Sequence, residues 1–373
     1  MHLTYQSTNQ AEGLNKMLRA GNNIRRPSNN VEKDNIKLQM AQKPGNGPLK
    51  PINAKGGKQV TKPTANIQHG AGEGSLQIKT KRINIQDNET KLLELAPDIY
   101  KYLVHHEKKF ILKEGFMEGG EPTSKMRRIL VDWLVQVHIR FHLLPETLHL
   151  TIFILDRMLE TKTISKSDLQ LLGISAMFVA SKFEEVYLPD IYDYEFITEN
   201  AFTKKQILSM EQVILNSLHF DLSCPSSLVF ARCLSRVLSE DETNPVDQTA
   251  FFYAYNISKC IGELALLDAV MSSVPKSHIA IAAMIIALNV FPVEGIDPKK
   301  AEEAVIAQLE ANKAEVTEAI SLLAQVAYKN FKQPKLVAIK NKYQSTKLGS
   351  ASTHMNDEVL DKIEALGRQS DME

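Results

Sequence analysis

The chain has 373 residues, and its 44 basic and 44 acidic side chains cancel to a formal net charge of zero. This balance gives no support for a chain-wide affinity for nucleic acid or membrane surfaces. Three cysteines without a Cys-x-x-Cys spacing argue against a disulfide scaffold and against a zinc site. No apolar run approaches the ~18 residues of a membrane span, so the sequence predicts a soluble protein of a reducing, intracellular compartment.

Residues 1–90 predict a disordered basic tail. They hold 14 lysines and arginines against 6 acidic residues, and Tyr5 is their only aromatic. Glycine, asparagine, lysine, glutamine and proline dominate, as in KPGNGPLKPINAKGGKQ (43–59). Such a stretch cannot bury enough apolar surface to offset the entropy lost on ordering it. The charge serves either solubility or short recognition signals, and Met17 is an alternative initiator that would make residues 1–16 an extension.

From about Glu94 the pattern becomes helical almost without interruption. Thr203 and Gln206 form a capping box at the start of one helix. Prolines at 145, 189, 225 and 292 separate apolar runs, and no alternating strand pattern of useful length occurs. The body is therefore predicted to be all-α. Four runs carry the 3.6-residue periodicity: AMFVASKFEEV (176–186), KKQILSMEQVILNSL (204–218), QTAFFYAYNISKCIGELALL (248–267) and KAEVTEAISLLAQVAYKNF (313–331).

An internal repeat indicates two similar halves. The pattern Ile174-x-Ala176-Met177-x-x-Ala180 recurs 107 residues later as Ile281-x-Ala283-Met284-x-x-Ala287. Both segments are rich in small residues and apolar all round, which is typical of a helix at the centre of a bundle. We predict two helical bundles in tandem, joined near residues 220–225.

Residues that could carry catalysis or hold a metal are sparse. The chain has no Gly-rich phosphate loop, dinucleotide fingerprint or His-Glu-x-x-His motif. His138 and His142 have metal-ligand spacing, but exposed or capping histidines are the better interpretation. Glu184 and Glu185 are adjacent and so point to different helix faces. We predict a non-catalytic chain with no cofactor and no metal.

The segment MRRILVDWLVQV (126–137) contains the only tryptophan. On a helical wheel its apolar residues cover about 240°, well beyond the roughly 100° stripe of an ordinary surface helix. Such a helix is either central in a core or shared between a core and a binding partner, and the wheel alone leaves both open. The residues at i, i+3, i+4 and i+7 are Met126, Ile129, Leu130 and Trp133, and those on the other side are Val131, Leu134 and Val135.

Charged residues inside apolar helices predict ion pairs, because an unpaired buried charge costs several kcal/mol. Four such residues, two of each sign, give two pairs. Arg127 with Asp156 is interpreted as a structural bridge. Lys182 with Glu211, flanked by Phe183 and Phe220, is interpreted as a partly exposed site that offers charge and aromatic surface to a partner.

Together these segments resemble the cyclin family, from about Leu95 to about Lys347. Gln136 in WLVQV and the terminal KNKY resemble the B-type, G2/mitotic-specific cyclins, with an A-type cyclin as the alternative. FARCLSR (230–236) and Leu188 depart from the usual B-type pattern. The matching segments, in family order, are MRRILVDWLVQV (126–137), ILDRML (154–159), LQLLGISAMFVASKFEEVY (169–187), FTKKQILSMEQVILNSLHFDL (202–222) and IKNKY (339–343).

The resemblance implies a tandem cyclin fold of two five-helix bundles that binds and activates a mitotic cyclin-dependent protein kinase. It implies four parts: a disordered regulatory tail (1–90), an N-terminal cyclin box with a preceding helix (91–221), a C-terminal cyclin fold (222–345) and a C-terminal tail (346–373). The implied kinase-binding residues are Lys182, Glu211, Phe183, Val179, Phe220, Leu222, Ile99 and Tyr102. The implied substrate-docking patch is Met126, Ile129, Leu130 and Trp133, with Gln136 and Gln170 at its polar edge.

The resemblance also implies further partners and a location. We expect substrates or inhibitors with docking motifs at the patch, ubiquitin ligase machinery at the tail, and shuttling between cytoplasm and nucleus. The tail lacks an Arg-x-x-Leu degradation box, and Lys33-Asp34-Asn35 is one change from a Lys-Glu-Asn box. We expect no membrane and no direct nucleic acid, although a nucleic-acid-binding transcription factor with the same fold is the alternative function.

Overall fold

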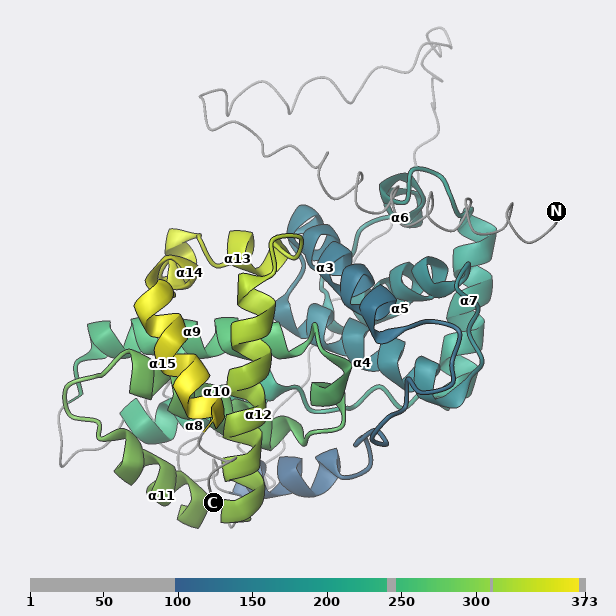
Figure 1. Ribbon diagram of the computed structural model, residues 1–373. Helices are drawn as coiled ribbons and strands as arrows, with labels where there is room; N and C mark the ends of the chain where they lie inside the picture. The colour runs from purple at the N-terminus through teal and green to yellow at the C-terminus, as the bar shows by residue number, and fades with distance from the viewer. Residues whose placement is uncertain (1–97, 240–245, 309–310, 369–373) are drawn as a thin grey trace, which may run out of the picture. The chain divides into compact units, whose positions relative to one another are not determined.

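Helices joined by turns and short loops make up the described part of the chain (Figure 1). The computed structural model describes residues 98–239, 246–308 and 311–368, and these ranges contain no strand. The all-α prediction is confirmed. The predicted tail over residues 1–90 lies outside the described residues. None of the described helices is long and apolar enough to cross a membrane.

The first bundle surrounds α5, which packs against α3, α4 and α7. Almost every residue of α5 is buried, as its small and apolar composition predicts. Proline at the first position of α4 and the capping box of Thr203 and Gln206 at α7 start those helices where expected. The helices are α3 (Ser124–Phe141), α4 (Pro145–Thr161), α5 (Leu169–Glu184), α6 (Ile191–Ile197) and α7 (Lys204–Ser217).

The second bundle repeats this plan around α10, which packs against α8, α9 and α12 (Figure 1). The repeated segments of the sequence thus form the two central helices, α5 and α10, and the predicted tandem arrangement is confirmed. The helices are α8 (Ser227–Ser239), α9 (Gln248–Ala265), the 3-10 turn η1 (Ala269–Ser272), α10 (Lys276–Val290), α11 (Pro298–Gln308) and α12 (Lys313–Lys332).

Gly173 sets the close approach of α3 and α5. A Cβ at this position would lie 3.0 Å from both terminal methyl carbons of Leu130. By contrast, a Cβ at Gly262 in α9 would have no neighbour within 4 Å. Two mid-helix glycines therefore differ in the space around them.

Gly173→Ala is expected to lower the free energy of unfolding by about 1–3 kcal/mol through overpacking. Gly262→Ala, the matched control, is expected to raise it by up to ~1 kcal/mol, because alanine favours helix over glycine. Urea denaturation of both variants measures the difference, and equal effects at the two positions would contradict the packing argument.

The ion pair of Arg127 and Asp156 is buried, with Arg127 Nε 2.5 Å from Asp156 Oδ1. The prediction of this pair is confirmed, and Arg127 also forms hydrogen bonds with the second bundle. Arg127 Nη1 donates to the carbonyl of Leu266 over 3.0 Å, and Nη2 donates to Ser272 Oγ over 3.2 Å. Arg128 adds a bond from Nη2 to Asp268 Oδ2 over 2.5 Å. The guanidinium groups of α3 thus connect the two bundles.

The KNKY segment ends the second bundle in helix α13 (Ala338–Lys342), which packs against α3 and α9. Glu263 of α9 holds this segment, because its Oε1 accepts from Lys342 Nζ over 2.6 Å and from Tyr343 Oη over 2.9 Å. On the other side, the N–H of Ala338 donates to Asp132 Oδ1 over 3.0 Å. A short segment late in the chain therefore covers one face of α3.

Asp132 is a buried carboxyl, and burial raises its pKa from the usual 3.8 to about 6, although bonds from Ala338 and Gln136 partly oppose the shift. Folding therefore favours the protonated form. The penalty of burying the charge is absent below pH 3.8 and grows as pH rises to about 6, so this group lowers stability over that interval.

Asp132→Asn is expected to raise the free energy of unfolding at pH 7 by about 1–3 kcal/mol, because the amide has no charge to desolvate and still accepts from Ala338. The change is also expected to flatten the pH dependence between pH 4 and pH 6. Urea midpoints from pH 4 to pH 8 measure both effects. A variant less stable than the parent at pH 7 would show that the ionised carboxylate is net stabilising.

The segment 346–373, predicted as a C-terminal tail, is helical as far as Arg368. After η2 (Thr346–Leu348) and α14 (Ala351–His354), helix α15 (Asp357–Arg368) packs against α12. Leu360 and Ile363 on its apolar face are buried. The carbonyl of Gly367 accepts from Ser321 Oγ and Gln325 Nε2 of α12. The apolar spacing of α15 explains the docking, since a 3.6-residue stripe needs a covering surface.

Candidate functional site

Lys182 and Glu211 form an ion pair at the edge of the first bundle, with Lys182 Nζ 2.6 Å from Glu211 Oε1. Lys182 lies in the last turn of α5, where a cation is favoured by the helix dipole. Glu211 projects from α7, which packs against α5. The lysine side chain is 42% exposed and the glutamate 11%. The pair predicted from the sequence is therefore formed, with its amine open to a partner.

Aromatic contacts fix the position of the ammonium group. Lys182 Nζ lies 4.2 Å from the ring centroid of Phe178, close enough for a cation–π interaction. Tyr194 packs edge-on to Phe178 and donates a hydrogen bond to Ser181 Oγ over 2.8 Å. Glu211 from one side and Phe178 from the other therefore hold Lys182 in one orientation.

Two large apolar side chains on the same two segments, one next to Lys182 in the chain and one just after α7, remain exposed. Phe183 is 55% exposed and Phe220 is 68% exposed. His219 and Phe220 have φ values of 50° and 60°, in the left-handed region that residues other than glycine rarely adopt. Strained backbone of this kind concentrates at functional sites. The chain reversal after α7 thus presents the ring of Phe220 to solvent.

The other predicted kinase-binding residues divide into two groups. Val179 and Leu222 are buried, so they support the surface from below and cannot themselves contact a partner. Ile99 and Tyr102, on the helix over residues 98–107, are exposed. The prediction of an apolar contact surface formed by all of these residues therefore needs correction for Val179 and Leu222. Helical periodicity places Val179 of α5 on the core side, and Leu222 lies in the linker after α7 with its side chain turned inward.

The helix over residues 98–107 is attached to the second bundle and to the linker between the bundles. Glu107 is buried and accepts hydrogen bonds from the Ser277 hydroxyl and from the Ser277 N–H, the latter over 3.0 Å, at the start of α10. His106 Nε2 lies 3.0 Å from Ser223 Oγ in the linker between the bundles. Tyr100 packs edge-on to Phe230 of α8. The exposed side chains of this helix are consequently held in fixed positions.

The loop after α5 contributes exposed residues that the sequence reasoning did not assign to the site. Val186, Tyr187 and Leu188 are exposed, and Tyr187 is 91% exposed. The sequence signal for Tyr187 and Leu188 is that two large apolar residues follow the helical run and directly precede Pro189. Glu185 anchors the loop, because its Oε1 accepts from the N–H of Leu144 over 2.6 Å and from the hydroxyl of Thr147.

Two residues of the predicted substrate-docking patch, Leu130 and Trp133, belong to the core. Leu130 is fully buried and Trp133 is 2% exposed, and Val131, Leu134 and Val135 on the other side of the helix are fully buried as well. Met126 and Ile129 are half-buried, and so are Gln136 and Gln170. The correction has a physical cause: α5 approaches α3 closely at Gly173, and α13 covers α3 from another side. Only Met126 and Ile129 can offer apolar surface here.

The histidines and cysteines have structural environments. His142 is the C-cap of α3, with φ 56°, and His138 Nε2 donates to the carbonyl of Leu144. Burial lowers the pKa of both His138 and His149 to about 3, so both are neutral. Burial raises the pKa of the Cys224 thiol to about 12 and also raises those of Cys233 and Cys260. Within the described ranges, no three such side chains are arranged to hold a metal.

Comparison with known proteins identifies the family. Residues 98–223 match the cyclin N-terminal domain family and residues 225–357 match the cyclin C-terminal domain family. The G2/mitotic-specific cyclin-B1 of Caenorhabditis elegans is 66% identical over 357 residues, which cover 95% of this chain and 98% of that protein. The G2/mitotic-specific cyclin-B of Patella vulgata is 38% identical over 278 residues, 74% of this chain and 64% of that protein.

A solved structure supports the fold. A viral cyclin from herpesvirus saimiri superposes with a TM-score of 0.54 at 19% sequence identity, covering 62% of this chain and 97% of that chain. The fold, the two family matches and the 66% identical relative agree with one another. The chain therefore belongs to the cyclin family, and within it to the B-type, G2/mitotic-specific cyclins.

Proposed function

We propose that this chain is the regulatory subunit that binds and activates a mitotic cyclin-dependent protein kinase. The observation that carries the proposal is the Lys182–Glu211 pair, formed at the edge of the first bundle, with the exposed rings of Phe183 next to Lys182 in the chain and Phe220 just after α7. Relatives with this fold are named G2/mitotic-specific cyclins. Phosphoryl transfer itself belongs to the kinase, and the chain contributes a binding surface.

The pair supplies polar recognition. A lysine ammonium has three donors, and one of them in Lys182 is used by Glu211. The remaining donors and the second carboxylate oxygen are available to backbone groups beside the C-helix of the kinase. Since the pair is already assembled, binding does not have to order it, and this preorganisation favours affinity.

The aromatic rings supply apolar surface for a population shift. A kinase is active only when its C-helix glutamate reaches the catalytic lysine. A partner that raises the active C-helix position from about 1% to about 99% of the kinase population must bind that position about 5.5 kcal/mol more favourably than the inactive one. Complete burial of one phenylalanine contributes roughly 1.5–3 kcal/mol. Phe183 and Phe220 together with a desolvated ion pair can therefore supply the required difference.

The proposal is tested by mixing the full chain with a purified mitotic cyclin-dependent kinase and a histone substrate. Phosphate incorporation is expected to rise about 100-fold over the kinase alone, the change that a shift of this size produces. Lys362→Ala, which removes an exposed ion pair on α15, should activate as well as the parent chain. Phosphorylation that stays at the level of the kinase alone would reject the function.

We extend the proposal to further partners and to location. Met126 and Ile129, with Gln136 and Gln170 beside them, are proposed to contact docking segments of substrates or inhibitors. The basic tail is proposed to recruit ubiquitin ligase machinery and to support shuttling between cytoplasm and nucleus. Ile129→Asp should lower phosphorylation of docking-dependent substrates and leave histone phosphorylation unchanged, whereas equal loss on both would contradict a docking role.

The alternative function, a nucleic-acid-binding transcription factor of the same fold, is not favoured by the relatives, which are named mitotic cyclins. If lysines and arginines of the chain contacted DNA phosphates, its affinity for duplex DNA would fall steeply as the salt concentration rises. Titration of the full chain with duplex DNA between 50 and 200 mM salt distinguishes the two functions.

A further inference from the structure

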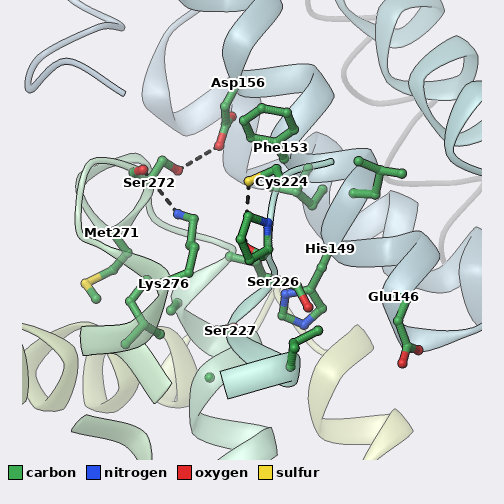
Figure 2. Close-up of a pocket in the computed structure, with 18 of the residues that line it drawn as sticks. Glu146, His149, Phe153, Asp156, Cys224, Ser226, Ser227, Met271, Ser272 and Lys276 are labelled. Atoms are coloured by element: carbon green, nitrogen blue, oxygen red, sulfur yellow. Dashed lines mark hydrogen bonds between the residues drawn. The ribbon is translucent and has the colours of Figure 1, made fainter. Parts of the chain in front are cut away.

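A cavity of about 170 Å³ lies where the two bundles meet (Figure 2). Its walls come from α4, from the linker that leads into α8, from α9, and from η1 with the start of α10. Water needs only about 10–15 Å³, whereas an engineered apolar cavity of about 150 Å³ binds benzene. The cavity is therefore large enough for an organic ligand of a single ring.

Most of the cavity wall is apolar. Leu150, Phe153, Met271 and Ile279 line it, and Gly262 forms a stretch of wall without a side chain. A Cβ at Gly262 would meet nothing within 4 Å, so the space over this glycine is open. An apolar body placed here would exchange water contact for contact with these side chains, which is favourable.

One end of the cavity carries an ammonium group with unused donors. Lys276 lies deep in the protein yet keeps accessible surface, because it lines the cavity. Its Nζ donates one hydrogen bond, to the carbonyl of Ser272 over 3.1 Å. Asp156, the nearby carboxylate, is already bonded to Arg127 and to Ser272 Oγ. Burial lowers the pKa of Lys276, although the nearby carboxylates of Asp156 and Glu107 partly oppose the shift.

Two carboxylates lie near that end, Asp156 and the buried Glu107, and both already accept hydrogen bonds from other groups. Figure 2 shows Lys276 and Glu146 on opposite sides of the cavity, and Glu146 is ion-paired with Arg232. Glu184, also on the wall, has a raised pKa because of burial and of the neighbouring Glu146 and Glu185. His149 Nε2, a neutral buried nitrogen of the lining, has no hydrogen-bond partner in the described ranges. An anionic group is thus favoured only beside Lys276.

We propose that this cavity binds a small monocarboxylate with an aromatic or short aliphatic body, its carboxylate on Lys276 Nζ and its body over Gly262. A single compact ammonium matches one negative charge, and a charge-assisted hydrogen bond in a buried site is among the stronger polar contacts. A dianion such as phosphate would leave charge uncompensated against apolar walls. The proposal is independent of kinase activation, because the site is distinct from the Lys182–Glu211 surface.

The test measures binding of three probes to the full chain without kinase, by ligand-observed NMR and by the thermal unfolding midpoint. Benzoate is the carboxylate, benzyl alcohol its neutral isostere and inorganic phosphate the rival anion. Benzoate is expected to bind about tenfold more tightly than benzyl alcohol, the effect of one charge-assisted hydrogen bond. Equal binding of benzoate and benzyl alcohol, or stronger binding of phosphate, would overturn the proposal.

Two variants locate the site. Lys276→Met should remove the preference for benzoate over benzyl alcohol, while Lys299→Met, at an exposed lysine of α11, should retain it. Gly262→Leu should abolish binding of both aromatic probes by filling the cavity, and Gly262→Ala should weaken it if the leucine variant fails to fold. Benzoate binding that persists unchanged in Lys276→Met and Gly262→Ala would place the ligand elsewhere and reject the inference.

Discussion

Replacing Arg127 by alanine is expected to lower the free energy of unfolding by about 3–5 kcal/mol, the usual cost of removing one partner of a buried ion pair. Asp156 would remain buried with Ser272 as its hydrogen-bond partner. The bonds from Arg127 to Leu266 and Ser272 across the two bundles would also be lost. The effect therefore combines an unpaired charge with a weakened joint between the bundles.

Urea denaturation with two signals measures both consequences. Trp133 is the only tryptophan and lies in the first bundle, so its fluorescence reports that bundle, whereas circular dichroism reports all helices. The two curves should coincide in the parent chain and separate in Arg127→Ala. Arg368→Ala, which removes an exposed pair with Glu364, should cost no more than ~0.5 kcal/mol. An equally small loss of unfolding free energy in Arg127→Ala would contradict the role of Arg127 in connecting the two bundles.

The second large effect is on kinase binding. Lys182→Ala and Glu211→Ala are each expected to weaken affinity for the kinase about 100-fold, within the range of interface hot spots. Lys182 is half-exposed in the free chain, so its loss should leave the helical signal nearly unchanged. Titration calorimetry or surface plasmon resonance with the purified kinase measures the affinity.

The double variant gives a sharper result. Because Glu211 and the ring of Phe178 hold Lys182 in place, the two single changes disrupt one unit, and Lys182→Ala with Glu211→Ala should cost much less than the sum of the two. Lys362→Ala with Glu358→Ala, an exposed pair of the same chemistry, should leave affinity unchanged. Fully additive losses would indicate that each residue acts alone.

Local patterns predicted much of this fold. The small-residue repeat identified α5 and α10 as central helices, since close helix packing needs small side chains. The capping box of α7 and the proline of α4 set helix starts. Charge inside apolar helices predicted both ion pairs, because a buried charge has to find an opposite one.

Contacts between distant segments could not be predicted in this way. The helical wheel of α3 left open whether Trp133 faces the core or a partner, and the decision lies in α13, about two hundred residues later. The bond from Ser277 to Glu107 joins residues with no shared pattern in the sequence. Val179 and Leu222 belong to recognised segments, but whether their side chains reach the surface depends on how the helices pack.

Helix α15 bears on how this protein can be shortened for experiment. A version ended at residue 345, the predicted end of the C-terminal cyclin fold, would remove Leu360 and Ile363 and uncover the side of α12 on which they rest. The exposed stripe would then be free to associate with other copies. Expression at useful solubility consequently favours an end point beyond Arg368, with any affinity handle placed after it.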